Sequence, residues 1–148
     1  MNKQKTRIIE LAIKCIEAEY KTAGDAFCSS ETATTYFKLQ LHSEEREVLA
    51  VLFLDSKNKM IKFEKLFYGS INHSFVSVRE IIKEALKQNA AAIILGHNHP
   101  SGDCKPSKAD LAATKEIQKA TKIMDIKLLD HVIVTKTECY SMTDHRQI

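Results

Sequence analysis

Several protein classes are excluded by what this sequence lacks. No stretch approaches the roughly 20 consecutive apolar residues of a membrane-spanning helix. The N-terminal region has no uninterrupted apolar centre like that of a signal peptide, because Glu10, Lys14 and Glu17 interrupt it. The four cysteines form no Cys-x-x-Cys pair, which argues against a zinc ribbon and a thioredoxin-like motif. We therefore expect a cytoplasmic protein with reduced thiols and no membrane association.

An excess of charge of one sign is also lacking. The 22 lysine and arginine residues nearly balance the 19 aspartate and glutamate residues, and the net charge of +3 is spread along the chain. A dedicated nucleic-acid binder usually shows a basic patch, and single-strand binding uses aromatic side chains within a basic groove. Neither is recognisable here, so nucleic-acid contact stays possible but has no support from the sequence.

The 148 residues are enough for one folded domain, since a chain of this length buries roughly 68–70% of its unfolded surface. Hydrophobic periodicity predicts helices alternating with strands. The predicted helices cover residues 6–20, 29–41, 78–88 and 107–124, and the predicted strands cover 47–55, 60–69, 91–97, 126–135 and 138–142. This order predicts an α/β domain of three layers, with helices covering the sheet. We place an N-terminal helical segment at 1–25 and the main domain at 26–148.

The most informative stretch is 96–110, Gly-His-Asn-His-Pro-Ser-Gly-Asp-Cys-Lys-Pro-Ser-Lys-Ala-Asp. It follows the apolar run 90–95, which is typical of a strand buried on both faces. Side chains two apart on an extended chain point the same way, so His97 and His99 can face one ion from the carboxyl end of the strand. Imidazole nitrogen and carboxylate oxygen suit Zn²⁺, and three protein ligands leave a fourth tetrahedral position for water. His97, His99 and Asp110 therefore predict a catalytic site with one zinc ion per chain.

A second interpretation of the same stretch is a helix start. Pro106 and Ser107 stand at the beginning of the predicted helix, and Ser107 with Asp110 forms a Ser-x-x-Asp capping box. Such a box is common without any metal, and two nearby histidines can belong to a solvated turn. We expect the inner side of this helix to carry Leu111, Ala112, Ile117 and Ala120.

Two other residues are weaker candidates for the site. Cys104 lies inside the loop and could approach an ion, although an incidental loop residue is the simpler interpretation. His131 follows Asp130 on an apolar strand, where we expect a core or supporting histidine, with metal ligation as the alternative. The sequence has no His-Glu-x-x-His, which excludes a thermolysin-type site. It also has no Pro-Cys-x-x-Cys, which argues against zinc deamination.

The pattern His97-x-His99-Pro100, then six residues to Ser107 and two more to Asp110, resembles the signature of the JAMM (MPN+, JAB) metalloprotease domain. Further motifs resemble its bacterial RadC-like branch: 51–55 (Val-Leu-Phe-Leu-Asp), 69–72 (Gly-Ser-Ile-Asn), 79–81 (Arg-Glu-Ile) and 129–131 (Leu-Asp-His). The resemblance covers about residues 30–148. It implies a cytidine-deaminase-like fold with a mixed sheet. Full-length RadC-like relatives carry an N-terminal helix-hairpin-helix region, which we expect this chain to lack.

The resemblance also implies the catalytic base. The family places a glutamate at the start of the first strand, where Glu44, Glu45 and Glu47 all compete. Glu47 immediately precedes the apolar residues, so we choose Glu47, with Glu45 as the alternative. Glu47 stands at the start of its strand and His97 at the end of its own. The two therefore meet only if the first strand runs antiparallel to the strand of the metal loop.

The resulting hypothesis is a zinc-dependent hydrolase, a peptidase or isopeptidase. In it the metal is held by His97, His99 and Asp110, Glu47 is the general base, and Ser107 helps to stabilise the oxyanion, as the matching serine does in the family. The partner is then a peptide or protein substrate of unknown identity. The alternative is a DNA-associated RadC-like protein without protease activity, because RadC-like proteins are associated with DNA repair and mobile elements. Nothing in the sequence indicates an oligomeric state.

Overall fold

The computed structural model describes residues 2–22, 29–69 and 76–148. In chain order its elements are α1 (Lys3–Thr22), α2 (Ser30–Leu41), β1 (Val48–Leu54), β2 (Met60–Tyr68), α3 (Val78–Lys87), β3 (Ala92–Asn98), α4 (Lys108–Ile123), β4 (Lys127–Val134) and β5 (Cys139–Ser141). The predicted boundary between 1–25 and 26–148 lies outside the described residues. So does most of the 69–72 motif.

The five strands form one mixed sheet with the order β2-β1-β3-β4-β5. β1 is antiparallel to both β2 and β3, β4 is parallel to β3, and β5 is antiparallel to β4. Leu49 of β1 lies opposite His97 of β3. The start of β1 and the end of β3 therefore lie side by side, which is the orientation that Glu47 requires if it is to act as the base.

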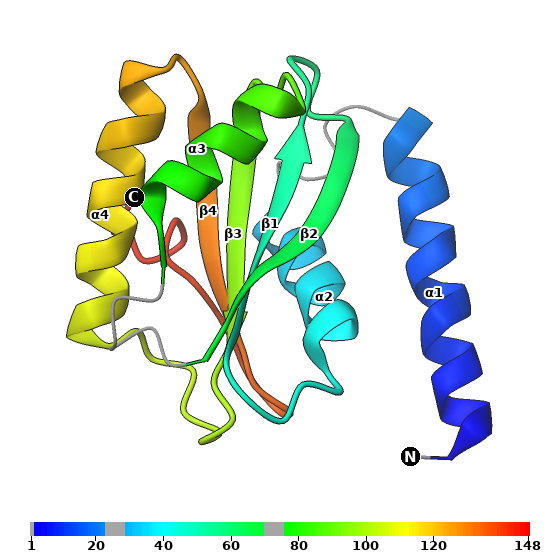
Figure 1. Ribbon diagram of the computed structural model, residues 1–148. Helices are drawn as coiled ribbons and strands as arrows, with labels where there is room; N and C mark the ends of the chain where they lie inside the picture. The colour runs from blue at the N-terminus through cyan, green and yellow to red at the C-terminus, as the bar shows by residue number, and fades with distance from the viewer. Residues whose placement is uncertain (1, 23–28, 70–75) are drawn as a thin grey trace.

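Helices cover both faces of the sheet, which gives three layers (Figure 1). Alternate residues of β1 point to opposite faces. Leu49, Val51 and Phe53 pack with Ile81 of α3 and Ile117 of α4. The intervening residues of β1 pack with α2 and with partly buried residues of α1. The α/β class with a mixed sheet is thus confirmed, with one hydrophobic core on each face.

α2 packs closely on β3 because Gly96 has no side chain. A Cβ built on Gly96 would overlap the ring of Phe37, a fully buried residue of α2. Gly96 immediately precedes His97, so this contact holds α2 against the part of β3 that carries the histidine. A larger residue would overpack the core, which typically costs about 1–3 kcal/mol.

α1 lies beside α2, and none of its residues is fully buried (Figure 1). Ile13, Ile16 and Tyr20 pack against the core on that face. Tyr36 of α2 donates a hydrogen bond of 2.9 Å to a carboxylate oxygen of Glu17 in α1. Burial and the contact with Glu17 raise the pKa of Tyr36 above its ordinary value of 10.0. The hydroxyl therefore keeps its proton and continues to hold α1 to the domain.

One prediction about α4 is wrong. Ala112 is exposed, whereas Thr114, Ile117 and Thr121 are buried together with Asp110. These four buried residues recur at intervals of three and four, which is the spacing of one helix face. The inner stripe of α4 is thus largely polar, and a search for apolar residues alone could not find it.

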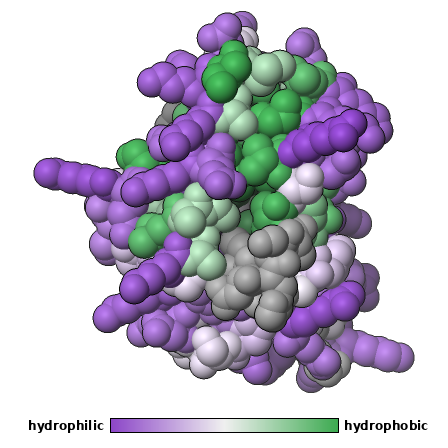
Figure 2. All heavy atoms as spheres, turned by 60° about the vertical axis from the view of Figure 1, so that its left-hand side comes forward, coloured by the Kyte–Doolittle hydropathy of each residue, from purple (hydrophilic) through white to green (hydrophobic). Residues whose placement is uncertain are grey.

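The side of the molecule formed by α3 and α4 presents apolar as well as charged side chains to solvent (Figure 2). The exposed large apolar residues of these two helices and the turn after α4 include Leu86, Ile123 and Met124. In the part of the chain that the structure describes, no helix is both long and apolar enough to span a membrane.

Candidate metal centre

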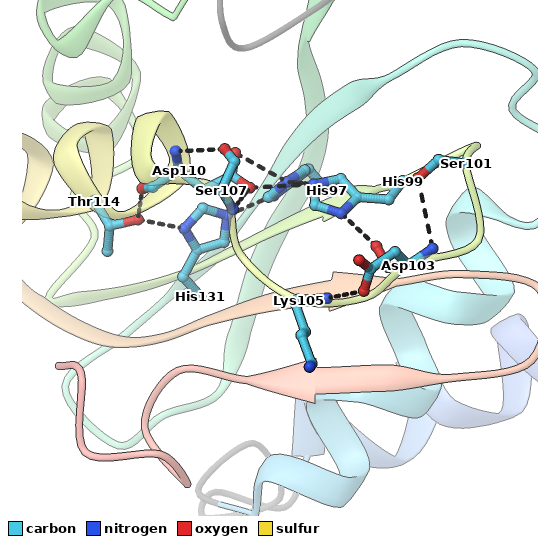
Figure 3. A network of polar contacts seen from close by, with 9 residues as sticks. All are labelled: His97, His99, Ser101, Asp103, Lys105, Ser107, Asp110, Thr114 and His131. Carbon is cyan, nitrogen blue, oxygen red and sulfur yellow. Dashed lines mark hydrogen bonds and ion pairs between the residues drawn. The ribbon is translucent and has the colours of Figure 1, made fainter.

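His97, His99 and Asp110 converge at the carboxyl end of β3 (Figure 3). One ligand atom from each lies within 4.8 Å of the others. Nε2 of His97 is 2.8 Å from Nε2 of His99, and oxygens of Asp110 lie 3.4 and 3.2 Å from these two nitrogens. Ligands of a tetrahedral zinc lie roughly 3.3 Å apart. Both aspartate separations match this value and the histidine pair is somewhat closer, so the group could hold a metal ion.

β3 and the loop after it give the two histidines their direction. His97 belongs to β3, and His99 is the first residue after it. Their side chains share one side of the extended chain, with Asn98 directed to the other. Nδ1 of His99 donates a hydrogen bond of 2.7 Å to the backbone carbonyl of Asp103. Since a carbonyl only accepts, the neutral ring carries its hydrogen on Nδ1 and leaves Nε2 free for a metal.

Helix capping brings Asp110 to the histidines. The hydroxyl oxygen of Ser107 accepts a hydrogen bond of 3.1 Å from the backbone N–H of Asp110. In return Oδ2 of Asp110 accepts one of 2.8 Å from the backbone N–H of Ser107. Oδ1 of the fully buried Asp110 accepts no hydrogen bond from any residue that the structure describes. The capping box and the metal site therefore coexist, because the cap leaves one carboxylate oxygen for a cation.

The charges of the centre favour an ionised carboxylate. Burial acts to raise the pKa of Asp110, but His97, His99 and the N–H of Ser107 outweigh it and hold the pKa well below the usual 3.8. For His99 burial acts to lower the pKa, but Asp110, the Asp103 carbonyl and the charge of Glu47 hold it above the usual 6.5. Asp110 is thus a ready anionic ligand, and a proton competes with a metal at His99.

His131 lies behind His97 and does not belong to the group of three that can hold an ion. Its Nε2 is 2.7 Å from Nδ1 of His97, and its Nδ1 is 2.6 Å from the hydroxyl oxygen of Thr114. Burial lowers the pKa of His131 well below its usual 6.5, so the ring is neutral. Of the two roles expected from the sequence, the geometry favours the supporting one.

Glu47 is placed beside the centre by β1. Leu49 lies opposite His97, and continuing this antiparallel register by two residues puts Glu47 opposite His99. Directly opposite residues extend to the same face of a sheet. The negative charge of Glu47 contributes to the raised pKa of His99. The carboxylate and the histidines therefore share one side of the strand ends.

Asn98 fixes the segment that carries Glu47. Its side-chain oxygen accepts a hydrogen bond of 2.7 Å from the N–H of Val48, and its side-chain N–H donates one of 3.0 Å to the carbonyl of Arg46. These two bonds bracket Glu47 on both sides in the chain. The backbone carbonyl of Glu47 is itself bonded by the N–H of Gly69 at 2.8 Å. The base candidate thus sits on a segment with fixed backbone.

The two other glutamates of this segment have different surroundings. Glu44 forms an ion pair of 2.6 Å with Lys65 of β2. Glu45 is exposed to solvent, whereas Glu47 is partly buried. These surroundings favour Glu47 over Glu45.

A cavity of about 740 Å³ adjoins the centre, with His99 in its wall. The other walls come from the end of α2, the segment before β1, the metal loop and the turn after β4, and include Leu41, Glu45, Pro100 and Lys136. Residues from four separate segments therefore meet where a substrate could reach His99.

The remaining loop residues shape the site from outside. Asp103 orients His99 through its carbonyl, and its side chain accepts a hydrogen bond of 3.0 Å from the N–H of Lys105. The thiol of Cys104 donates to a carboxylate oxygen of Glu138 at 3.4 Å. Cys104 is not part of the group that can hold a metal among the described residues. The simpler interpretation of Cys104, as an incidental loop residue, fits these contacts.

Two supporting residues were missed by sequence reasoning. Thr114 looks like any helix threonine, and only its spacing of four residues from Asp110 places it on the same face. Asn98 stands between two histidines, and the alternation of a strand already directs it away from them. That alternation was the available signal for Asn98.

Comparisons with known proteins agree with this geometry. The family model of the RadC-like JAB domain matches residues 27–147. A UPF0758 protein of Actinobacillus pleuropneumoniae is 52% identical over 114 residues, which are 77% of this chain and 52% of that protein. One of Haemophilus influenzae is 54% identical over 115 residues, covering 78% of this chain and 52% of the relative.

A UPF0758 protein of Vibrio cholerae is 44% identical over 131 residues, which are 88% of this chain and 82% of that protein. The chain thus spans about half the length of the Actinobacillus and Haemophilus relatives, and most of the Vibrio one. The family model covers the whole sheet and every residue of the candidate centre. The resemblance found in the motifs is confirmed, and this chain belongs to the RadC-like JAB domain family.

Proposed function

We propose that this protein is a zinc-dependent hydrolase of JAMM type that cleaves peptide or isopeptide bonds. The observation that carries the proposal is the convergence of two imidazoles and a buried carboxylate, one oxygen of which has no hydrogen-bond donor among the described residues. Two nitrogens and one oxygen suit zinc, and three protein ligands leave one position open for a reactant. The proposal includes one ion per chain and the cytidine-deaminase-like form of the fold.

The chemistry divides among three groups. Zinc bound by His97, His99 and Asp110 would supply a water whose pKa falls to roughly 7. Glu47 takes the proton of the attacking water and passes it to the leaving amine. Its place opposite His99 in the strand register supports this role.

Ser107 can serve both the helix and the reaction. As a cap its hydroxyl oxygen accepts a hydrogen bond, so the cap does not use the hydroxyl hydrogen. That hydrogen can be donated to the carbonyl oxygen of the substrate as negative charge develops on it. The cap thereby holds the hydroxyl in place for the reaction.

The cavity beside His99 is where we place the substrate. Its volume of about 740 Å³ lies within the range of known ligand sites, roughly 300–1,000 Å³. Apolar Leu41 and Pro100 in its wall can contact a side chain, and the exposed Ser101 and Lys136 offer polar groups. A peptide lying here reaches the centre at His99, which belongs both to the cavity wall and to the group of candidate ligands.

The test combines metal analysis with cleavage of a peptide library. Wild-type protein is expected to contain about one zinc per chain. Glu47→Gln should keep the zinc and lower the cleavage rate by about 10²–10⁴-fold, because the amide cannot take a proton. Glu45→Gln tests the alternative base and should lose much less activity than Glu47→Gln, because Glu45 borders the cavity but takes no proton.

Two results would count against this assignment. Loss of activity in Glu45→Gln with full activity in Glu47→Gln would move the base to Glu45. Protein that takes up no zinc and cleaves nothing, yet binds DNA with a steep dependence on salt, would favour the DNA-associated alternative.

A further inference from the structure

Thr114, His131 and His97 form a continuous chain of short polar contacts behind the candidate metal centre (Figure 3). The three side chains are at most 3% exposed, so bulk water does not reach them. Buried polar groups in such a chain must pair donors with acceptors throughout. The identity of each donor can therefore be worked out from one end.

Thr114 is the end of this chain of contacts farthest from the candidate metal centre. Its hydroxyl lies 2.6 Å from the backbone carbonyl of Asp110, one turn earlier in α4. A carbonyl only accepts, so the single hydroxyl hydrogen is donated to it. The hydroxyl oxygen can then only accept from Nδ1 of His131, which lies 2.6 Å away. His131 therefore carries its hydrogen on Nδ1.

His97 receives the other contact of His131. The His131 ring is fully buried and its two nitrogens face a hydroxyl and another imidazole, an environment that holds a neutral ring with one hydrogen. That hydrogen is on Nδ1, so Nε2 is an acceptor. Nδ1 of His97 lies 2.7 Å from this nitrogen and must be the donor. Nε2 of His97 then carries no hydrogen when the ring is neutral, and this is the atom that faces Asp110 and His99.

A separate observation agrees with this assignment. Oδ1 of Asp110 lies 3.4 Å from Nε2 of His97 yet accepts no hydrogen bond from any described residue. With no hydrogen on Nε2 this buried oxygen has no donor from His97, and a cation between the two atoms would satisfy both.

We propose that Thr114 and His131 are positioning residues that hold His97 in the tautomer whose Nε2 is ready to bind a divalent metal. The inference rests on the metal site of the proposed function and adds two residues to it. One turn of α4 supplies Asp110 as a ligand and, through the carbonyl of Asp110 and Thr114, orients the His97 ligand. The position of the carboxylate and the protonation of the imidazole are thus set by the same helical turn.

The first experiment observes the tautomer directly. Long-range ¹H–¹⁵N spectra of the full chain, stripped of metal by a chelator, distinguish a hydrogen on Nδ1 of His97 from one on Nε2. The wild type is expected to show Nδ1–H, and Thr114→Val is expected to show a mixture of tautomers. Thr114→Ser keeps the hydroxyl and should keep the wild-type spectrum. A wild-type spectrum with the hydrogen on Nε2 would overturn the proposal.

The second experiment measures Zn²⁺ affinity by competition with a chelator. Thr114→Val should bind Zn²⁺ about 10–100-fold more weakly, the usual effect of removing such a supporting contact, while Thr114→Ser stays close to wild type. His131→Gln can place an oxygen where Nε2 accepts, whereas the shorter His131→Asn cannot. The glutamine variant should therefore bind Zn²⁺ more tightly than the asparagine variant.

The two experiments separate this inference from the proposed function. An unchanged Zn²⁺ affinity and an unchanged His97 tautomer in a folded Thr114→Val protein would refute the positioning role of Thr114 and His131, although zinc-dependent cleavage could still stand. A wild-type protein with the expected His97 tautomer but no cleavage of any peptide would support the positioning role of Thr114 and His131 and would refute the peptidase assignment. Thermal unfolding of each variant shows whether a change in affinity follows from a loss of fold.

Discussion

The candidate metal centre has an inner wall and an outer wall, which differ in burial. The inner wall consists of His97, Asp110, Thr114 and His131, none of them more than 3% exposed. Its side chains are held mainly by one another, through contacts of 2.6 and 2.7 Å. Because each member depends on the next, a change at one position alters the donors and acceptors of the others.

The outer wall consists of Glu47, His99 and Ser107, all of them partly exposed. These residues are held largely by backbone groups: the Asp103 carbonyl for His99, the N–H of Gly69 for Glu47, and the capping bonds of α4 for Ser107. Of these residues, His99 also forms part of the cavity wall. The comparison indicates a division of work, in which the inner wall fixes the ligands and the outer wall meets water and substrate.

The largest expected effect compares the two histidines directly. His97→Ala and His99→Ala each remove one of three ligands, so both should lose nearly all bound zinc. Only His97→Ala also leaves Nε2 of the buried His131 without a donor, which costs about 1–3 kcal/mol. The carbonyl of Asp103, which His99→Ala leaves unpaired, lies on an exposed residue where water can replace the ring.

The measurement is zinc content by elemental analysis, followed by urea unfolding of the chelator-treated proteins. At a pH above the raised pKa of His99, where its charge no longer contributes, the zinc-free unfolding free energy should fall clearly in His97→Ala and little in His99→Ala. Equal losses of unfolding free energy in the two variants would mean that both rings contribute equally to the zinc-free fold. The inner and outer walls would then not differ in this respect.

The candidate ligands were easier to predict from the sequence than the residues that support them. His97, His99 and Asp110 form a local pattern with Ser107, and the preference for Glu47 comes from the family resemblance together with its place before an apolar strand. The orientation of β1 against β3 was required by that choice and is present. In these cases the residues that decide the geometry lie close together in the chain. Strand alternation and helix capping then predict which way their side chains point.

The inner wall depends on contacts between distant segments. His131 reaches His97 from the neighbouring strand β4, and Thr114 reaches His131 from α4. A histidine on an apolar strand leaves its role open until its partners are known. The wrong placement of Ala112 has the same cause, because a stripe chosen by apolarity overlooks buried threonines that are satisfied by hydrogen bonds.

The next prediction sharpens the comparison at Ser107, which belongs to the outer wall but caps the helix of the inner one. Ser107→Ala should lower the turnover number by about 10²–10³-fold through loss of a donor to the oxyanion. It should also cost about 0.5–2 kcal/mol of stability through loss of the cap. Ser107→Gly removes the same hydroxyl but costs only a few tenths of a kcal/mol at a cap position.

The two variants together separate the roles of the serine. If the hydroxyl acts on the substrate, both variants should be equally slow although they differ in unfolding free energy. If activity instead followed stability, with Ser107→Gly nearly as active as wild type, the hydroxyl would be a cap alone. Steady-state kinetics and urea unfolding of the zinc-loaded proteins provide both quantities.

The smallest expected effect is the dependence of stability on pH, which zinc should largely abolish above pH 6.5. Without metal, the pKa of His99 is raised above its usual 6.5, so its contribution is complete below that value and is lost as the pH rises through the raised pKa. The pKa of Asp110 is lowered, so its contribution is lost only in acid well below the usual 3.8. Chelator-treated protein should therefore lose stability as the pH rises above 6.5 through the raised pKa of His99.

With excess Zn²⁺ the ligand nitrogen of His99 must give up its proton, so affinity should fall about tenfold for each pH unit below the pKa of the ring. Over the range in which the zinc-free protein loses stability, the rising affinity offsets that loss, so the stability of the zinc-loaded protein should stay nearly constant. Urea unfolding at several pH values, with and without zinc, measures both slopes. His99→Ala should flatten the dependence of zinc-free stability on pH. If the dependence persists in this variant, a group other than His99 is responsible for it.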